Sequence, residues 1–476
     1  MELINFIKTK AKNIIGEKNL EFISHAKNYM SATFFTKALG FISVPVFTRL
    51  LTPDEYGILA IFSSVISIAT ILLGLNFKGS VVRYYHEDKN DFGQFMFSNF
   101  IFLLVFNIFS FYFINLFKKD IANLIGINVN IFIIAVITAT INFPLNLYLY
   151  YLRGSKKSKR YSIISVSKSI VLLVISIIWV YLLSSNRYYG KIYAQLFITV
   201  ILLLISIFYL VKIFKFKFKF KYVKYALSFG VPLIPHALSG FILSYFDRIA
   251  INQISGSLDT GLYSLAYNVG MIMNVVVMAM NKAWTPIFYD NLKENKFTEI
   301  NDLAYNYAKY IYLAAISLVL FSQELVIILA DQSYHKALNL VPIIIISYVF
   351  VFLYTLYGNY SFYRKRTGLI SIATLSAGFI NIGLNYWLIP KFGYVAAAYT
   401  TLFSYIFLFL FHYFNVKFVL KEKIISLSKW LPNLFLILII IILYLILNQI
   451  IVSYFLLFFI KLIVFFVSIY YFIFWK

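Results

Sequence analysis

Residues 229–263 read FGVPLIPHALSGFILSYFDRIAINQISGSLDTGLY, an apolar stretch that two prolines interrupt and that an acidic–basic pair follows. Its length and hydrophobicity predict a membrane helix, and Pro232 and Pro235 predict a break within that helix. Asp247 is the single carboxylate that our expected helix boundaries place inside a hydrophobic segment, and Arg248 follows it directly. Because ionisable residues within membrane helices usually have a function, this stretch is the first place to look for one.

An earlier stretch, residues 36–57, repeats the same plan. It has an apolar helix with Pro45, then Thr48-Arg49, then a polar turn and the aromatic–glycine pair Tyr56-Gly57. Two copies of one arrangement, in a chain with little charge inside its hydrophobic segments, predict a duplicated transporter with its pathway between the halves.

Composition places the whole chain in the membrane. Of its 476 residues, 62% are hydrophobic, 20% aromatic and only 13% charged, which exceeds what a water-soluble domain can bury. The net charge of +24 comes from lysines and arginines in short loops between apolar segments, so it predicts membrane topology and no nucleic-acid partner. Cysteine is absent, which excludes disulfides and thiolate metal sites.

Hydrophobic segments long enough to span a bilayer predict an all-α polytopic membrane protein with about fourteen transmembrane helices. We expect a cytoplasmic amphipathic segment, a first six-helix lobe, a basic interfacial linker, a second six-helix lobe and a final helix pair. Their expected ranges are 1–28, 29–211, 212–225, 226–415 and 416–476. Matching prolines, Pro144 and Pro342, in the fourth helix of each lobe support two repeats of the same orientation.

Most of the 42 lysines and arginines lie in the first segment, in the loops after even-numbered helices and at the carboxyl end. An excess of basic residues marks the cytoplasmic side, so both termini are predicted to be cytoplasmic. Basic hairpins at 153–160 and 364–366 occupy equivalent places in the two repeats. Between the lobes, residues 212–221 alternate lysine with apolar residues, and we interpret them as an interfacial linker on anionic headgroups rather than as a strand.

The sequence shows no apparatus for catalysis. No loop is long enough to fold into a catalytic domain, and no phosphate-binding glycine loop or metal-spaced cluster of His, Glu and Asp is present. We therefore expect no enzyme activity, no cofactor and no metal.

Residues 52–55, Thr-Pro-Asp-Glu, form a capping box with proline at the first helical position. They predict the start of the second helix. For Arg49, one turn earlier, pairing with Asp54 or Glu55 is favoured over contact with a substrate.

Three lysines are the best candidates for a basic cavity within the membrane. Lys37, Lys168 and Lys309 lie six to eight residues beyond the expected inner ends of their helices, about 9–12 Å deep at 1.5 Å per residue. An unpaired ammonium at the centre of a membrane helix costs about 2.5–3.5 kcal/mol. Each long side chain could instead extend to the inner surface, but three at a similar depth favour a shared hydrated cavity. Lys461, in the final helix pair, is less easily placed there.

Asp247 and Arg248 are expected to form a local or interhelical ion pair that acts in gating, with a proton- or Na⁺-coupling role for Asp247 as the alternative. His236 is interpreted as a packing residue. Pro45, Pro232 and Pro235 are candidate hinges, because proline removes a helical hydrogen bond. Arg83, at the inner end of the second helix, is either a solvated loop residue or a contact for a ligand headgroup.

The chain resembles the Wzx-type polysaccharide flippases of the multidrug/oligosaccharidyl-lipid/polysaccharide exporter superfamily. The resemblance rests on residues 45–57 (PVFTRLLTPDEYG), on Asp247-Arg248 followed by 261–267 (GLYSLAY), and on 390–400 (PKFGYVAAAYT). It implies two six-helix lobes like those of multidrug and toxic compound extrusion (MATE) transporters, around a central cavity lined with basic residues. Its helices 1, 2, 7 and 8 line that cavity, which suits Lys37 and, less directly, Arg49 and Arg83.

The expected function is the movement of an undecaprenyl-diphosphate-linked oligosaccharide, an O-antigen, capsule or related unit, from the inner to the outer leaflet by alternating access. The expected location is the bacterial cytoplasmic membrane, and the expected partners are this lipid, anionic membrane lipids, a polysaccharide polymerase and glycosyltransferases. The alternatives are a drug or cation antiporter on the same fold, which would need buried carboxylates to bind cations, and a membrane glycosyltransferase or polymerase.

Overall fold

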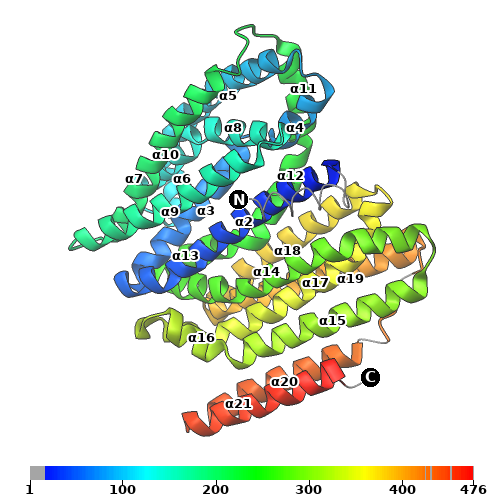
Figure 1. Ribbon diagram of the computed structural model, residues 1–476. Coiled ribbons are helices and arrows are strands. Elements are labelled where there is room, and N and C mark those ends of the chain that lie inside the picture. Colours follow the sequence, from blue (N-terminus) through cyan, green and yellow to red (C-terminus); the bar gives the residue numbers. More distant parts are fainter. Residues whose placement is uncertain (1–16, 424, 429–430, 451–452, 475–476) are drawn as a thin grey trace, which may run out of the picture. The chain divides into compact units, whose positions relative to one another are not determined.

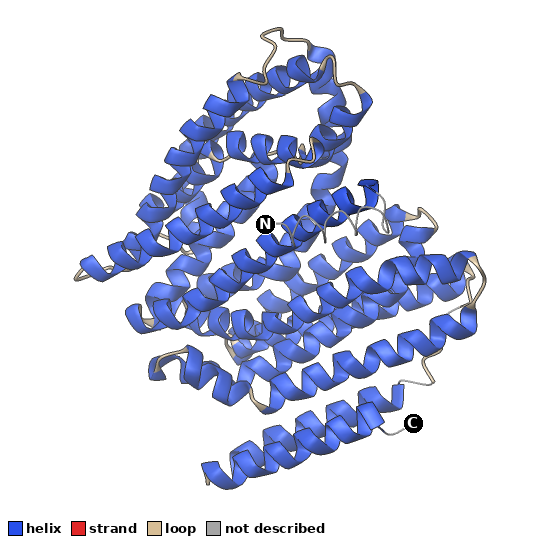
Figure 2. Ribbon diagram, viewed as in Figure 1, coloured by secondary structure: helices blue, strands red, loops and turns tan. Residues whose placement is uncertain are grey.

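The computed structural model describes residues 17–423, 425–428, 431–450 and 453–474, and over these ranges it contains helices and loops but no strand (Figure 2). Thirteen helices of the described chain are long and apolar enough to cross a membrane, and Leu431–Leu447 is a shorter apolar helix. The all-α polytopic fold is therefore confirmed. The candidate spans are Lys27–Leu50, Pro53–Leu73, Phe92–Leu116, Val129–Gly154, Ser158–Leu182, Tyr188–Val211, Phe220–Ser255, Ser257–Lys293, Phe297–Leu320, Gln332–Tyr363, Thr367–Phe392, Val395–Leu420 and Phe455–Ile473.

The chain divides into two compact units. Unit 1 contains the residues up to Leu50 and Phe62–Ile234, and unit 2 contains Leu51–Ile61 and Pro235–Lys476. The division falls at the proline pair rather than within 212–225, and it assigns the start of the second span to unit 2. Whether 29–211 and 226–415 act as two lobes stays a prediction.

Unit 1 is a helical bundle whose elements are labelled in Figure 1. They are α2 (Glu17–Leu50), the later part of α3 (Pro53–Leu73), α4 (Lys78–Glu87), α5 (Phe92–Leu116), α6 (Lys118–Ile125), α7 (Val129–Ile141), α8 (Phe143–Gly154), α9 (Ser158–Leu182), α10 (Tyr188–Val211), α11 (Phe220–Gly230) and the 3₁₀ turn η1 (Val231–Leu233).

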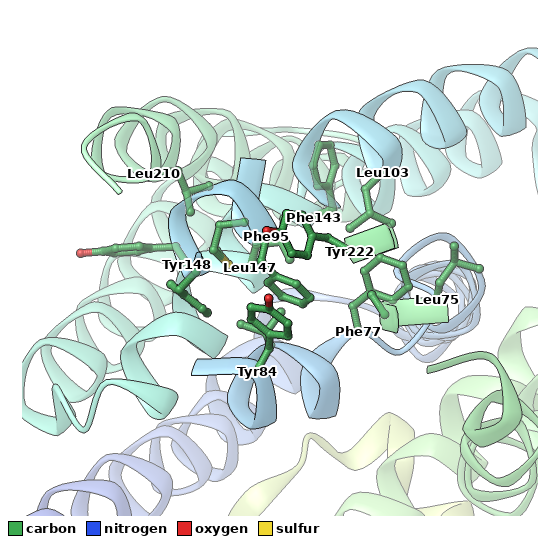
Figure 3. Close-up of a cluster of buried hydrophobic side chains, with 14 of the residues drawn as sticks. Leu75, Phe77, Tyr84, Phe95, Leu103, Phe143, Leu147, Tyr148, Leu210 and Tyr222 are labelled. Atoms are coloured by element: carbon green, nitrogen blue, oxygen red, sulfur yellow. The ribbon is translucent and has the colours of Figure 1, made fainter. Parts of the chain in front are cut away.

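An aromatic core holds one end of unit 1 together (Figure 3). The rings of Tyr84 and Phe95 stack with centroids 4.1 Å apart, and Tyr222 from α11 meets Tyr84 edge-on at 5.7 Å. Such ring pairs stabilise by about 0.5–1.5 kcal/mol beyond the area that they bury. The core therefore joins α4 and α5 to α11, which follows the basic linker in the sequence.

Two acidic side chains fasten α11 further. The Tyr222 hydroxyl donates to Asp91 at 2.5 Å, and the Tyr225 hydroxyl donates to Glu87 at 2.6 Å. The bond from Tyr222 lowers the pKa of Asp91, and the bonds from Tyr225 and then Arg83 lower the pKa of Glu87. These carboxylates therefore remain ionised acceptors at neutral pH.

The basic linker contains no strand. Its backbone runs along the start of α5, where the Lys215 N–H donates to the Gly93 carbonyl at 3.2 Å and the Lys219 N–H to the Ser98 hydroxyl at 3.0 Å. Residues 212–219 form a loop rather than a strand, and 220–221 begin α11. The role of 212–225 as an interfacial linker between lobes and its contact with headgroups stay predictions.

Unit 2 is a second helical bundle, in which α17 packs against α14, α15 and α19, and α20 and α21 pack against α15. Its elements are the start of α3, α12 (Ile234–Phe241), the π-helical turn η2 (Ile242–Phe246), α13 (Asp247–Ser255), α14 (Ser257–Lys293), α15 (Phe297–Leu320), α16 (Ser322–Leu329), the 3₁₀ segment η3 (Gln332–Leu340), α17 (Val341–Tyr363), α18 (Thr367–Phe392), α19 (Val395–Phe414), the π-helical turn η4 (Asn415–Leu420), α20 (Leu431–Ile450), α21 (Tyr454–Ile469) and η5 (Tyr470–Phe474).

Three of the prolines lie at interruptions between helical segments. Pro232 lies in the 3₁₀ turn between α11 and α12, Pro144 begins α8 after a break at Asn142, and Pro342 begins α17 after η3. Pro45 behaves differently, because α2 continues through it to Leu50. A helix can pass through proline at the cost of one hydrogen bond, so Pro45 does not divide its helix. The hinge role of these prolines stays a prediction.

The charge pattern predicts which loops face the outside. A cysteine at Ser184, an exposed residue between α9 and α10, should react with a membrane-impermeant maleimide in intact cells. A cysteine at Asn295, an exposed residue between α14 and α15, should react only after the membrane is permeabilised. The chain has no native cysteine, so labelling reports the introduced residue alone. The opposite pattern at both positions would reverse the predicted topology.

Candidate functional site

Asp247 lies at the first residue of α13, directly after the π-helical turn η2, and is fully buried in unit 2. Inserted π turns often occur at functional sites, because they redirect the side chains that follow. Burying a carboxyl group is costly unless its oxygens are hydrogen-bonded, and a charged one needs a partner as well. The surroundings of Asp247 therefore decide what it does.

Three donors from three other helices meet this carboxylate. The hydroxyls of Tyr263 on α14 and Thr401 on α19 donate to Oδ2, each at 2.6 Å. The Asn385 side-chain amide on α18 donates to Oδ1 at 2.7 Å. These bonds satisfy both oxygens of the Asp247 carboxyl group and join four helices of unit 2.

A second layer of polar groups orients Asn385. Its carbonyl accepts from the Thr400 hydroxyl at 2.6 Å, and its amide also donates to Asn381 Oδ1 at 3.1 Å. Thr400 and Asn381 are themselves buried. The network consists of oxygen and amide groups, the chemistry that hard cations such as Na⁺ accept as ligands. No group of three or more His, Cys, Asp or Glu residues with the geometry of a metal site occurs among the described residues.

The expected ion pair between Asp247 and Arg248 does not form. The guanidinium of Arg248 donates to the Ser244 carbonyl at 2.6 Å and lies 4.5 Å from the ring centroid of Tyr267 and 5.3 Å from that of Tyr245. Consecutive residues of a helix do not face each other, so Asp247 and Arg248 meet different neighbours. Arg248 is a buried cation held by rings and a carbonyl.

The three lysines lie well inside helices that are long and apolar enough to cross a membrane. Lys37, Lys168 and Lys309 lie ten, ten and twelve residues beyond the first residues of the candidate spans Lys27–Leu50, Ser158–Leu182 and Phe297–Leu320. Each is therefore within two residues of the middle of its helical span, and its depth in a membrane stays a prediction.

Their surroundings differ. Lys37 is exposed on α2 and Lys168 is partly buried on α9, two helices of unit 1 that pack together. Lys309, in unit 2, lies 4.7 Å from the ring centroid of Tyr305. Among the described residues, none gives any of the three lysines an ion pair or hydrogen bond. Whether they face one cavity stays a prediction.

The two candidate arginines have local partners. Arg49 donates to the Pro45 carbonyl at 2.8 Å within the last turn of α2. Arg83 on α4 forms an exposed ion pair with Glu87 at 2.6 Å, and this bond is the main reason that the pKa of Arg83 is raised. Arg83 is therefore a paired surface residue in this structure, and its contact with a ligand headgroup stays a prediction.

Lys461 has a role that the sequence does not reveal. It is buried on α21, where its ammonium pairs with Glu324 at 2.8 Å and bonds to Gln323 at 3.2 Å. Ser322–Leu329 forms the short helix α16, which brings Glu324 to Lys461. This buried pair links α21 to α16, and removing one partner would leave the other charge without compensation.

The motif at 45–57 has a structural explanation in unit 2. The Glu55 N–H donates to the Thr52 hydroxyl at 3.3 Å and the Thr52 N–H to Glu55 at 3.2 Å, which confirms the capping box. Beyond the box, the start of α3 bonds to α14, where Ser257 donates to Asp54 at 2.5 Å and Asn268 donates to Tyr56 at 3.0 Å.

Glycine residues allow the backbones of α3 and α14 to approach each other closely. A Cβ atom at Gly57 would lie 1.9 Å from the Ser257 carbonyl oxygen, and one at Gly261 would lie 1.8 Å from the Pro53 carbonyl oxygen. Small residues allow helix backbones in membranes to approach closely. Within unit 2, residues 53–57 of the first motif thus pack against the start of α14, which contains 261–267.

The sequence did not identify the partners of Asp247. The partner Tyr263 lies within the motif 261–267. Thr400, which directly precedes the partner Thr401, is the last residue of the motif 390–400. The available signal was the pair Asn381 and Asn385, four residues apart in an apolar helix. Residues at that spacing share a helix face, and a pair of amides on such a face predicts a buried polar partner.

The fold and the site thus define a polytopic membrane protein of the transporter class. A family model described as "Polysaccharide biosynthesis protein" matches residues 26–292. The chain belongs to this family, and the resemblance to polysaccharide flippases is confirmed.

Individual proteins agree with the family. The chain is 24% identical over 357 residues to "Lsg locus putative protein 1" of Haemophilus influenzae, covering 72% of this chain and 85% of that protein. It is 24% identical over 252 residues to "Succinoglycan biosynthesis transport protein ExoT" of Rhizobium meliloti, covering 51% and 49%. The fold is similar to that of the lipid II flippase MurJ in an inward closed conformation, with a TM-score of 0.75, 15% identity and coverage of 93% and 97%.

Proposed function

We propose that this protein moves an undecaprenyl-diphosphate-linked oligosaccharide from the inner to the outer leaflet of the bacterial cytoplasmic membrane by alternating access. The family and the fold support the coarser statement that it is a transporter or flippase of lipid-linked glycans rather than an enzyme. The direction, the diphosphate lipid and the membrane are our proposal.

The observation that carries the proposal is the position of Lys37, Lys168 and Lys309 near the middle of their spans, without an ion pair to any described residue. Uncompensated cations at this depth are unfavourable unless water or an anionic ligand stabilises them. A diphosphate headgroup supplies that charge, while its polyprenyl tail remains in the lipid.

A drug or cation antiporter would need negatively charged residues at its binding site. Cationic ligands are bound by carboxylates, and Asp247 already accepts three hydrogen bonds inside unit 2. The geometry therefore favours an anionic cargo over a cationic one. A polymerase and glycosyltransferases of the same glycan would then act before or after this step.

The substitution Lys37→Ala is expected to lower glycolipid translocation at least about tenfold, because one charge-assisted contact contributes about 1.5–3 kcal/mol. Lys37→Arg should keep part of the activity, since the charge remains at the same depth. The measurement is the rate at which a fluorescent undecaprenyl-diphosphate oligosaccharide becomes accessible to a periplasmic-side glycosidase in proteoliposomes.

Lys27→Ala is the matched control, because Lys27 is an exposed lysine at the first residue of the same span. It should translocate at close to the native rate. Lys461 is unsuitable as a neutral control, since it is paired with Glu324. Native activity in Lys37→Ala would show that Lys37 extends to the inner surface and does not contact cargo.

A further inference from the structure

The turn between α17 and α18, together with the end of η4, lines an open pocket of about 770 Å³ in unit 2. Its volume lies within the range of about 300–1,000 Å³ that is usual for ligand sites. Three consecutive cations, Arg364, Lys365 and Arg366, contribute to its wall. They form the basic hairpin that the sequence predicts on the cytoplasmic side, and the transport proposal assigns it no role.

The charges in this wall are only partly compensated. Arg364 forms a close ion pair with Glu422, which is also in the wall. Lys365 and Arg366 are exposed, and no described residue forms a hydrogen bond or ion pair with either side chain. Lys365 and Arg366 therefore add two positive charges to the wall, while its carboxylate, Glu422, pairs with Arg364.

The backbone of the turn is ordered by its own hydrogen bonds. The Arg366 N–H donates to the Ser361 carbonyl at 2.8 Å and the Lys365 N–H to the Phe362 carbonyl at 3.1 Å. Arg366 precedes α18, and no side chain caps that helix. The first-turn amides of α18 and its dipole thus add to the positive potential of the pocket.

The remaining wall is apolar and accessible. Ile372 on α18 is 54% exposed and Val419 on η4 is 62% exposed. In a chain that spans a membrane, such side chains on spanning helices face acyl chains. A site for a small water-soluble anion would gain nothing from this apolar edge, whereas a lipid presents a charged headgroup and an acyl chain together.

We propose that this pocket binds the phosphate headgroup of an anionic glycerophospholipid of the inner leaflet. Lys365, Arg366 and the first turn of α18 hold the phosphate, with the planar guanidinium suited to bidentate bonding. The acyl chains lie along Ile372 and Val419. Basic pockets at the cytoplasmic ends of membrane helices recognise lipid headgroups in this way. The proposal is independent of the cargo and of the direction of transport.

The test is native mass spectrometry of the detergent-purified full-length protein, titrated with dioleoyl-phosphatidylglycerol or with dioleoyl-phosphatidylcholine. The wild type should retain one phosphatidylglycerol more tightly than phosphatidylcholine of the same acyl chains. The double variant Lys365→Gln/Arg366→Gln should weaken phosphatidylglycerol binding at least about tenfold. Arg364 is left unchanged, because it already pairs with Glu422.

The matched control is Lys156→Gln/Lys159→Gln, which removes the same charge from two exposed lysines of the equivalent basic hairpin in unit 1. This control should bind phosphatidylglycerol within twofold of the wild type, and both variants should elute as monodisperse protein. Native binding by the Lys365/Arg366 variant, an equal loss in the control, or equal binding of phosphatidylcholine would overturn the proposal. Displacement of the lipid by millimolar inorganic phosphate would also overturn it and assign the pocket to a soluble anion.

Discussion

Replacing Gly57 by valine is expected to detach the start of α3 from α14. The added Cβ would lie 1.9 Å from the Ser257 carbonyl oxygen and 2.9 Å from the Gly261 N atom. Both are backbone atoms, so the clash cannot be relieved by a rotamer change and the two helices must separate. The hydrogen bonds from Ser257 to Asp54 and from Asn268 to Tyr56 would be lost with that separation.

Crosslinking measures this contact directly. In a chain without native cysteine, cysteines at Asp54 and Ser257 should be joined efficiently by a short bifunctional thiol reagent, and Gly57→Val should lower the crosslinked fraction at least about tenfold. Gly57→Ala should also lower the crosslinked fraction, but less than Gly57→Val does. This loss is expected although alanine favours a helix over glycine by about 1 kcal/mol.

Gly383→Ala in α18 is the control for this series, because a Cβ there meets no atom within 4 Å. It should leave crosslinking unchanged and be neutral or slightly stabilising. Efficient crosslinking in Gly57→Val would mean that the close approach of the two backbones is not needed for this contact.

Replacing Asp247 by leucine is expected to be the most damaging single change in the polar network of unit 2. Tyr263, Thr401 and Asn385 would each keep a buried donor without its acceptor. An unsatisfied buried group costs about 1–3 kcal/mol, and hydrogen bonds between membrane helices average about 0.6 kcal/mol because alternative partners exist. We therefore expect a loss of about 2–4 kcal/mol, measured as a lower thermal unfolding midpoint in detergent.

Removing a single donor should destabilise the protein less than removing the acceptor that the donors share. Tyr263→Phe and Thr401→Val each remove one bond while Asp247 keeps two donors, so each should cost about 0.5–1.5 kcal/mol. If Asp247→Leu is no less stable than either single variant, the carboxylate is not the centre of this network.

Asp247→Asn separates a structural role from ion coupling. We propose that Asp247 is structural and that the membrane potential helps to drive export, because each elementary charge crossing the field gains about 2.3 kcal/mol per 100 mV. An anionic headgroup moves outward under a negative interior potential. Proteoliposomes with potential, ΔpH and Na⁺ gradient imposed one at a time should show that both wild type and Asp247→Asn respond to the potential.

The coupling alternative makes a different prediction for the same experiment. Transport that ignores the potential, follows a proton or Na⁺ gradient and loses that dependence in Asp247→Asn would identify Asp247 as the coupling residue. The oxygen-rich surroundings formed with Thr400, Thr401 and Asn385 are chemically able to hold a cation, which makes this comparison decisive.

Patterns among neighbouring residues predicted the capping box, the proline interruptions and the apolar spans. Thr52 and Glu55 reach each other across a single helical turn, and Pro232, Pro144 and Pro342 act on the backbone at their own positions. These features need only neighbouring residues, so a sequence pattern suffices to predict them. The apolar spans follow equally directly from segment length and the thickness of the bilayer.

Errors arose where a partner was distant or a side chain had to choose a direction. Arg248 was assigned to Asp247 because the two are adjacent in sequence, yet adjacent helical residues point to different neighbours. Glu324 lies 137 residues from Lys461 in the sequence, and no local pattern predicts that the two form a pair.

The sequence by itself determined that this is an all-helical membrane protein, that its helices are interrupted near Pro144, Pro232 and Pro342, and which residues are charged within its spans. Those properties depend on hydrophobicity and on hydrogen bonds between near neighbours. Only the tertiary structure decided that Asp247 meets Asn385 and Thr401, more than a hundred residues away, and that Gly57 meets Gly261. Those contacts depend on which helix faces pack together, and such packing is set by the shape of whole helices rather than by any short stretch.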